Sequence, residues 1–330
     1  MYRALTKIFF LFPPEISHDL ALAFLKITNI FRLTKPNPIQ SSSRTLMGLH
    51  FPNPIGLAAG LDKNGDSISA LASLGFGFIE IGTVTPKPQP GNPKPRLFRL
   101  TKQEAIINRM GFNNKGVDYL IDSVKKAKFK GILGINIGKN RDTSLENAID
   151  DYLYSFTRVY PYASYITINI SSPNTASLRD LQHGELLRNL LQALKKSQTE
   201  LASTHQKYVP LVVKISPDLT QSELHALAEI LLEEKVDGVI ATNTTISRDG
   251  IEDSSYANEQ GGLSGKPLAS LSTQTVKTLH AVLQNQIPII ACGGISTTND
   301  IQEKLSAGAS LVQIYTGLIY HGPKLVRELL

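Results

Sequence analysis

The chain has 330 residues, a formal net charge of +6 and a single cysteine. One cysteine excludes an intramolecular disulfide and fits a reducing compartment, and the histidines show no metal-ligand spacing, so we expect no metal. A chain of this length can form one α/β barrel with a small extension.

The positive charge is concentrated at the N-terminus. Residues 1–45 carry six basic and two acidic side chains, a net +4, which leaves +2 for the rest of the chain. A basic and apolar N-terminus favours an anionic membrane surface. We expect no nucleic-acid partner, because no segment interleaves basic and aromatic residues.

Two amphipathic helices are predicted, over residues 2–12 and 15–31. Neither has 18 uninterrupted apolar residues and no cleavage site follows, so we expect neither a membrane span nor a signal peptide. The pattern fits either of two placements of a helical hairpin: packed on its own domain, or lying in a membrane interface. His18 falls on the polar strip, where a solvated side chain is expected. Residues 33–45 are rich in proline and serine and are typical of a linker, so we divide the chain into a hairpin, 1–40, and a catalytic domain, 41–330.

Short apolar runs then alternate with amphipathic segments. The strands are expected at Ile55–Ala58, Phe76–Ile81, Ile132–Asn136, Tyr165–Asn169, Leu211–Ile215, Gly238–Thr242, Ile289–Ala291 and Leu311–Tyr315. The helices are expected at Ser67–Ser73, Lys115–Ala127, Leu145–Val159, Gly184–Leu201, Gln221–Glu233, Ala269–Leu283 and Thr298–Ala307. Eight strands with crossover helices predict an α/β fold, a (β/α)8 TIM barrel.

Polar residues and glycines follow all eight strands, where the active site of such a barrel lies. The fourth strand runs into Ser171, Ser172 and Asn174, which by themselves could be turn or helix-capping residues. The turns CGGIS and YTG after the last two strands predict a phosphate-bearing cofactor, although a lone Gly-Gly also fits an ordinary turn. Cys292 fits a small core side chain.

Lys214 lies within an apolar strand and has no neighbouring carboxylate in the sequence. Burying an unpaired ammonium group costs free energy. An anionic partner such as a reduced flavin would remove that cost.

Seven motifs carry a resemblance to a known family: NRMGFNN, INIGKN, NISSPNT, VKISPD, GGLSGKPL, ACGGIS and AGASLVQIYTG. They resemble the motifs of the quinone-dependent, class 2 dihydroorotate dehydrogenases. The resemblance covers residues 45–330, and the N-terminal hairpin is similar to that family's extension. It implies an FMN-containing barrel that oxidises dihydroorotate to orotate in pyrimidine synthesis and reduces a membrane quinone. It also implies a peripheral, monomeric protein on the cytoplasmic face of the inner membrane, with the hairpin admitting quinone.

The resemblance assigns roles to individual residues. Ser172 matches the catalytic base. The substrate site is expected to contain Lys63, Asn108, Arg109, Met110, Gly111, Phe112, Asn169, Asn174, Asn243 and Thr244, with Asn113 and Asn114 as weaker candidates. The FMN site is expected to contain Ala59, Gly60, Leu61, Asp62, Lys63, Thr83, Asn136, Asn169, Lys214, Thr242, Gly265, Gly294, Tyr315 and Thr316.

One departure from the family lies after NISSPNT, where many relatives have Pro-Gly and this chain has Ala176 and Ser177. The alternatives are a soluble enzyme that uses fumarate or NAD, and a non-redox sugar-phosphate barrel or metabolite-binding module. His18 near the quinone headgroup is a further alternative to its solvated placement.

Overall fold

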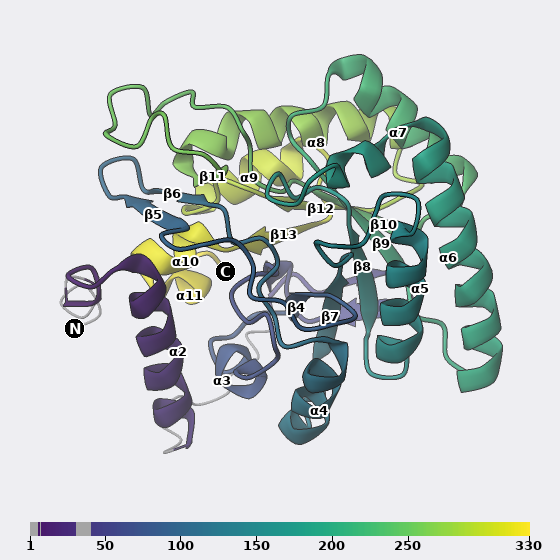
Figure 1. Ribbon diagram of the computed structural model, residues 1–330. Coiled ribbons are helices and arrows are strands. Elements are labelled where there is room, and N and C mark those ends of the chain that lie inside the picture. Colours follow the sequence, from purple (N-terminus) through teal and green to yellow (C-terminus); the bar gives the residue numbers. More distant parts are fainter. Residues whose placement is uncertain (1–5, 7, 31–40) are drawn as a thin grey trace.

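A closed barrel of eight parallel strands forms the centre of the molecule (Figure 1). The computed structural model describes residues 6, 8–30 and 41–330. The barrel strands are β3 (Ile55–Leu57), β4 (Phe78–Val84), β7 (Ile132–Ile137), β8 (Tyr165–Asn169), β9 (Leu211–Ile215), β10 (Gly238–Ala241), β12 (Ile289–Cys292) and β13 (Leu311–Ile314). The TIM-barrel prediction and all eight predicted strands are confirmed.

Helices follow the strands and cover the outside of the barrel (Figure 1). They are α3 (Ile68–Ala72), α4 (Val117–Ala127), α5 (Ala148–Val159), α6 (Gly184–His205), α7 (Gln221–Glu233), α8 (Ala269–Leu283) and α9 (Thr298–Ser306). Each lies where a helix was predicted. The last strand is followed by two short helices that were not predicted, α10 (Thr316–His321) and α11 (Leu325–Glu328).

Alternate residues of each barrel strand point inward and outward, as the pleat requires. The outward set, including Ile79, Ile166 and Val239, packs in one large cluster with the helices. The inward set, including Phe78, Tyr165 and Val212, forms a separate cluster inside the barrel. Two residues further along the same strands, the inner side chains become polar: Glu80, Thr167, Lys214 and Gln313 are all buried.

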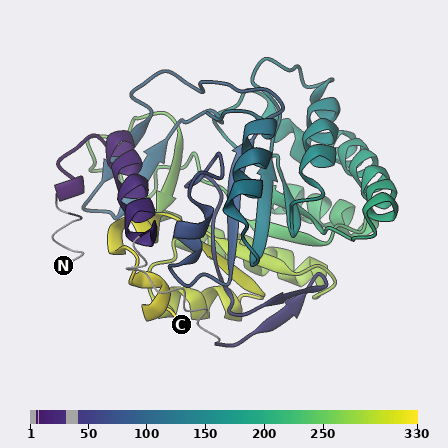
Figure 2. The same ribbon diagram turned by 90° about the horizontal axis from the view of Figure 1, so that it is seen from below.

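A hairpin of β1 (Arg44–Leu46) and β2 (Leu49–Phe51) closes the N-terminal end of the barrel and is seen in the view from below (Figure 2). Phe51 belongs to the inner cluster, and its ring meets Phe78 edge-on at 5.2 Å. The linker predicted over 33–45 is therefore wrong at its end, because Arg44 and Thr45 pair with β2. Its first residues lie outside the described part of the chain.

Three strands that were not predicted form a second, antiparallel sheet near the other end of the barrel (Figure 1). They are β5 (Leu97–Leu100), β6 (Ala105–Asn108) and β11 (Gly262–Gly265), in the order β11-β6-β5. β11 comes more than 150 residues after β6 in the chain. The sheet has its own small apolar core, which includes Phe98, Ile107 and Leu263.

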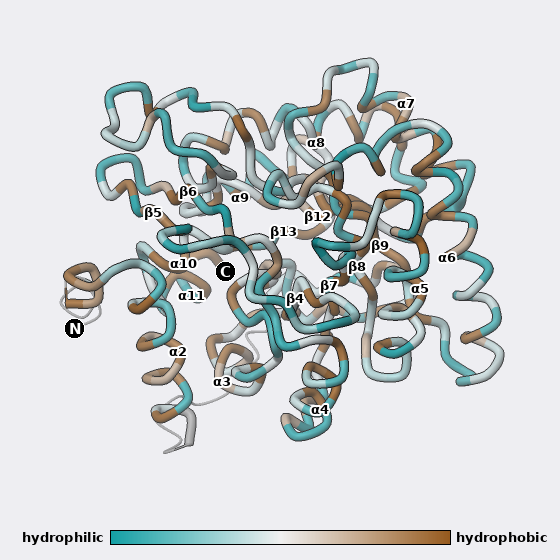
Figure 3. The backbone as a smooth tube through the Cα atoms, viewed as in Figure 1, coloured by the Kyte–Doolittle hydropathy of each residue, from teal (hydrophilic) through white to brown (hydrophobic). Residues whose placement is uncertain are grey.

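The second predicted N-terminal helix is confirmed as α2 (Pro14–Ile30). Of the helix expected over 2–12, residues 2–5 and 7 lie outside the described residues, Thr6, Ile8 and Phe9 are helical, and Phe10 and Leu11 form a turn. α2 packs against α3 and β5, and Glu15 Oε1 binds Arg96 Nη2 at 2.7 Å. The opposite face carries a line of exposed apolar side chains: Ile16, Leu20, Phe24 and Ile27. Hydrophobic segments recur along α2 in the backbone tube coloured by hydropathy (Figure 3). None of the described helices is long and apolar enough to span a bilayer.

Replacing Gly134 with alanine should destabilise the barrel strongly. An added Cβ would lie 2.2 Å from Cζ of Tyr165, a ring that is fully buried and cannot move aside. We expect a loss of about 1–3 kcal/mol in the free energy of unfolding, measured by denaturant titration.

Gly238→Ala is the matched control in another barrel strand. Its Cβ would meet chiefly the flexible Met47 thioether at 2.8 Å, so the loss should be clearly smaller. Equal losses for the two variants would contradict the packing described inside the barrel.

Candidate active site

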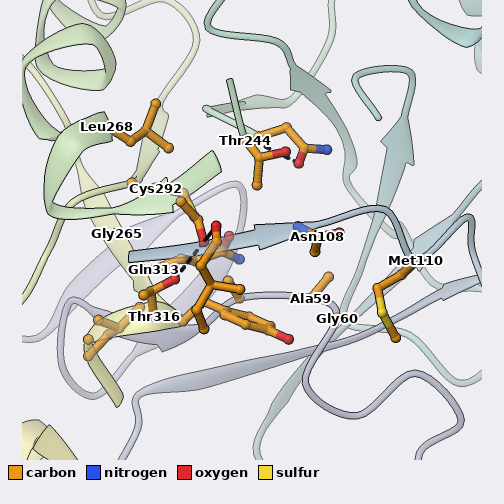
Figure 4. A pocket seen from close by; sticks show the side chains of 18 of the residues that line it. Ala59, Gly60, Asn108, Met110, Thr244, Gly265, Leu268, Cys292, Gln313 and Thr316 are labelled. Carbon is orange, nitrogen blue, oxygen red and sulfur yellow. Dashed lines mark hydrogen bonds between the residues drawn. The ribbon is translucent and has the colours of Figure 1, made fainter. Parts of the chain in front are cut away.

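A cavity opens at the C-terminal ends of the barrel strands, with the second sheet and α2 contributing to its wall. Its empty space, including the open mouth, is about 1370 Å³. In Figure 4, Gly265, Gln313 and Thr316 lie on one side of the cavity and Asn108 and Met110 on the other.

Most of the predicted site residues line this cavity. They are Ala59, Gly60, Lys63, Thr83, Asn108, Met110, Gly111, Phe112, Asn169, Ser172, Asn174, Lys214, Thr242, Asn243, Thr244, Gly265, Gly294, Tyr315 and Thr316. Segments that are far apart in the sequence are therefore brought together. Leu61, Asp62, Asn136 and Arg109 do not line it.

Each of these four has a different environment. The guanidinium of Arg109 turns outward, where it pairs with Glu259 and lies 4.7 Å from the ring centroid of Phe98. Asp62 accepts the backbone N–H groups of Asp66 and Ser67 at 2.9 and 2.7 Å, and with Leu61 it lines a second cavity beside α2. Asn136 is fully buried beneath the cavity wall.

Lys214 projects from β9 into the cavity and is only 5% exposed. Its ammonium group forms no hydrogen bond or ion pair with the described residues. A lysine buried in this way costs free energy unless a ligand supplies the partner. Its position therefore favours an anionic or electron-rich ligand next to β9.

A second lysine lies in the cavity wall nearest α2. Lys63 Nζ donates to the carbonyl of Gly60 at 3.0 Å. Burial, together with the positive charge of Arg96, lowers the pKa of Lys63 to about 8.

His18 is also in this wall, and the expectation that it is solvated is wrong. Burial and then the charge of Lys63 lower the pKa of His18 to about 4, so its imidazole is neutral at physiological pH. The prediction failed because the polar strip of α2 faces the barrel beside Lys63, while its apolar strip faces outward.

Ser172 follows β8 and is 6% exposed at the cavity wall. Its Oγ accepts the backbone N–H of Asn174 at 3.2 Å, and its hydroxyl proton has no acceptor among the described residues. The side chain of Asn174 donates to the carbonyl of Asn108 at 3.0 Å, which joins this loop to β6. In the same loop, Ser177 has φ +54°, a left-handed conformation that favours glycine.

Amide and hydroxyl groups form a continuous chain behind Ser172. Thr83 Oγ1 donates to Asn136 Oδ1 at 2.5 Å and accepts from Asn169 Nδ2 at 2.9 Å. Asn243 Nδ2 donates to Ser171 Oγ at 2.9 Å, and Ser171 Oγ donates to Asn169 Oδ1 at 3.0 Å. These links fix the side chains with which the cavity can bind a ring that has alternating N–H and C=O groups.

The opposite end of the cavity is lined by backbone turns. Gly265 and Gly294 have φ of +99° and +74°, and a Cβ on either would meet backbone atoms at 2.2–2.3 Å. Thr316 Oγ1 lies 2.8 Å from Ser264 Oγ, which connects the turn after β13 to β11. Glycine turns that expose N–H groups are suited to a phosphate.

Several cavity residues were missed by sequence reasoning. Leu97, Ile106 and Ser264 come from the second sheet, whose pairing joins distant segments and leaves no local pattern. Gln313 lines the cavity from inside the barrel, and Glu80 lies buried below it; an isolated polar residue in an apolar strand could have indicated both. Cys292, predicted as a core side chain, is buried and also lines the cavity; burial raises the pKa of its thiol.

The donor set fits FMN, since it combines a buried unpaired lysine, glycine turns for a phosphate and amides for a ring edge. Among the described residues, no group of three or more His, Cys, Asp or Glu could hold a metal ion. The geometry suits a flavin cofactor with a small planar substrate beside Ser172.

Comparison with known proteins agrees with this geometry. The dihydroorotate dehydrogenase family matches residues 41–330. A dihydroorotate dehydrogenase (quinone) of Acinetobacter baylyi is 56% identical, with 99% of this chain and 98% of the relative covered. One of Nitrosospira multiformis is also 56% identical, with 100% and 94% covered. The crystal structure of the Eimeria tenella enzyme in complex with ferulenol superposes with a TM-score of 0.88 at 41% identity, covering 96% of this chain and 89% of that one. The chain belongs to the dihydroorotate dehydrogenase family.

Proposed function

We propose that this protein oxidises (S)-dihydroorotate to orotate in pyrimidine synthesis, with FMN as its cofactor and a membrane quinone as electron acceptor. Family membership and the names of the relatives at 56% identity support the reaction. The observation that carries the cofactor assignment is Lys214, a buried lysine that faces the cavity and has no hydrogen-bond or ion-pair partner in the described part of the chain. Bound FMN supplies hydride acceptance from the substrate and electron transfer to quinone.

The protein's own residues position the substrate and move its proton. Ser172 acts as the base, because its Oγ lies at the cavity wall and its hydroxyl proton is not donated to another described residue. A serine is a weak base, so the proton passes onward to solvent as it leaves the substrate carbon. The pyrimidine ring is held by the side-chain amides of Asn108, Asn169, Asn174 and Asn243. Lys63 binds the substrate carboxylate.

Quinone enters beside α2. The apolar face of this helix points away from the barrel, and its polar face contributes Glu15 and His18 to the cavity wall. An apolar helix face can enter the membrane interface, where each buried methylene contributes roughly 0.8 kcal/mol. The protein then works as a peripheral monomer on the cytoplasmic face of the inner membrane.

Ser172→Ala should slow anaerobic flavin reduction by dihydroorotate by about 10²- to 10⁴-fold and leave FMN bound, because only the proton acceptor is removed. Stopped-flow bleaching of the flavin absorbance measures the rate. Ser203→Ala, on the exposed end of α6, is the control. An unchanged rate in Ser172→Ala would exclude Ser172 as the base.

The double variant Leu20→Glu/Phe24→Glu should lose vesicle binding and turnover with a long-chain quinone, because charges on the outer face of α2 oppose membrane burial. Flavin reduction by dihydroorotate should be retained. Leu186→Glu, which changes an exposed apolar side chain on α6, should behave like the wild type. Retained vesicle binding in the double variant would refute the role of α2.

Orotate binding should weaken above pH 8. Lys63 is protonated below a pKa of about 8, so its attraction for the carboxylate is complete there and is lost as the pH rises. The dissociation constant should rise by about tenfold per pH unit above pH 8 and become nearly independent of pH in Lys63→Met. Flavin difference spectra measure it.

Lys266→Met is the control for this pH dependence. Lys266 lies at the other end of the cavity, paired with Glu104 at 2.8 Å. This variant should keep the wild-type pH profile. A Lys63→Met enzyme with the wild-type profile would show that another group titrates.

A further inference from the structure

A carboxyl group with no cationic partner lies inside the barrel, below the cavity. Glu80 of β4 is fully buried, and none of the described basic side chains forms an ion pair with it. It accepts three hydrogen bonds from neutral groups: from Asn136 Nδ2 at 2.8 Å, from the Tyr165 hydroxyl at 2.9 Å and from Gln313 Nε2 at 2.8 Å. Such a group is costly to bury, and the fold could hold a methionine or leucine there instead.

The bond from Asn136 has a directional consequence. Glu80 Oε1 is an acceptor in this bond, so Asn136 must place its NH₂ group toward Glu80 and its carbonyl oxygen on the opposite side. With an apolar residue at position 80, both orientations of this amide would be open. Glu80 therefore selects one of two amide orientations.

That orientation passes along the chain of hydrogen bonds to the cavity. Because Asn136 presents its oxygen, the Thr83 hydroxyl donates to it and turns a lone pair toward Asn169. Asn169 then gives its NH₂ group to Thr83 and to Asn136. Its carbonyl oxygen is left to accept from Ser171 and, at 3.4 Å, from Asn243.

We propose that Glu80 is a positioning residue that sets the donor and acceptor pattern of Thr83, Asn169 and Asn243 toward the ligands in the cavity. It touches neither ligand itself, since it does not line the cavity. The identity of the ligands, FMN and orotate, rests on the proposed function. The hydrogen bonds that link Glu80 to the cavity do not depend on which ligands bind.

Glu80→Met is the direct test, because it removes the acceptor at nearly constant volume. Asn136 is then free to turn, and a ligand must meet the wrong donor or leave a buried group unpaired. We expect the dissociation constants of FMN and orotate to rise by roughly 10- to 100-fold. Flavin fluorescence and orotate-induced difference spectra of the full-length protein measure them.

Glu80→Gln should restore binding to within about threefold of the wild type, because its Oε1 still accepts from Asn136. Its Nε2 can donate to Tyr165, and Gln313 can turn its amide. The side-chain oxygen of Gln313 has no hydrogen-bond partner among the described residues. Rotation of the Gln313 amide would let this oxygen accept a hydrogen bond from the new glutamine.

Tyr165→Phe controls for a loss of stability alone. It removes another hydrogen bond to Glu80 and leaves the Asn136 link intact. It should lower the free energy of unfolding and leave both dissociation constants unchanged. If Glu80→Met does not fold, Glu80→Met/Tyr165→Phe removes one of the donors left unpaired without changing a residue that lines the cavity, and the same loss of binding is expected.

Unchanged dissociation constants in folded Glu80→Met would overturn the proposal, and so would an equal loss of binding in Tyr165→Phe. A wild-type protein that binds neither FMN nor orotate would refute the proposed function instead. The two failures are therefore separate.

Discussion

The inner face of the barrel changes from apolar to polar along its axis, and this change positions the whole site. Phe78, Tyr165 and Val212 fill the lower layer, under the cover of Phe51. Two residues after Phe78 and Val212 come Glu80 and Lys214, which lie above the apolar layer because alternate residues share a face. The apolar layer excludes water from below, so these polar groups must bind one another or a ligand.

The polar groups above the apolar layer are of two kinds. The first kind forms hydrogen bonds within the protein and so makes a rigid wall: Glu80, Asn136, Thr83 and Asn169. Lys214 has no partner among residues 6, 8–30 and 41–330 and faces the cavity. A rigid amide wall beside an unpaired lysine is suited to hold a planar, electron-rich cofactor against a small planar substrate.

Much of this could be predicted from the sequence, because buried parallel strands leave continuous apolar runs. Ile166 and Val213, for example, lie in runs that were predicted as strands and are strands. The second sheet could not be predicted, because Gly262 pairs with Asn108 and the short β5 and β6 carry no period of their own. Arg109 was assigned to the substrate site through its motif, yet its side chain turns outward to Glu259, an ion pair that no local pattern indicates. Glu80 was missed because its partners come from three other strands.

Under the proposed function, the barrel mouth holds a flavin that exchanges electrons with dihydroorotate and with quinone. An anaerobic absorbance titration of the purified protein follows both exchanges in one experiment. We expect a yellow protein whose flavin absorbance is bleached by dihydroorotate and returns when a short-chain quinone is added. A colourless, fully folded protein, or a flavin that dihydroorotate leaves oxidised, would contradict it.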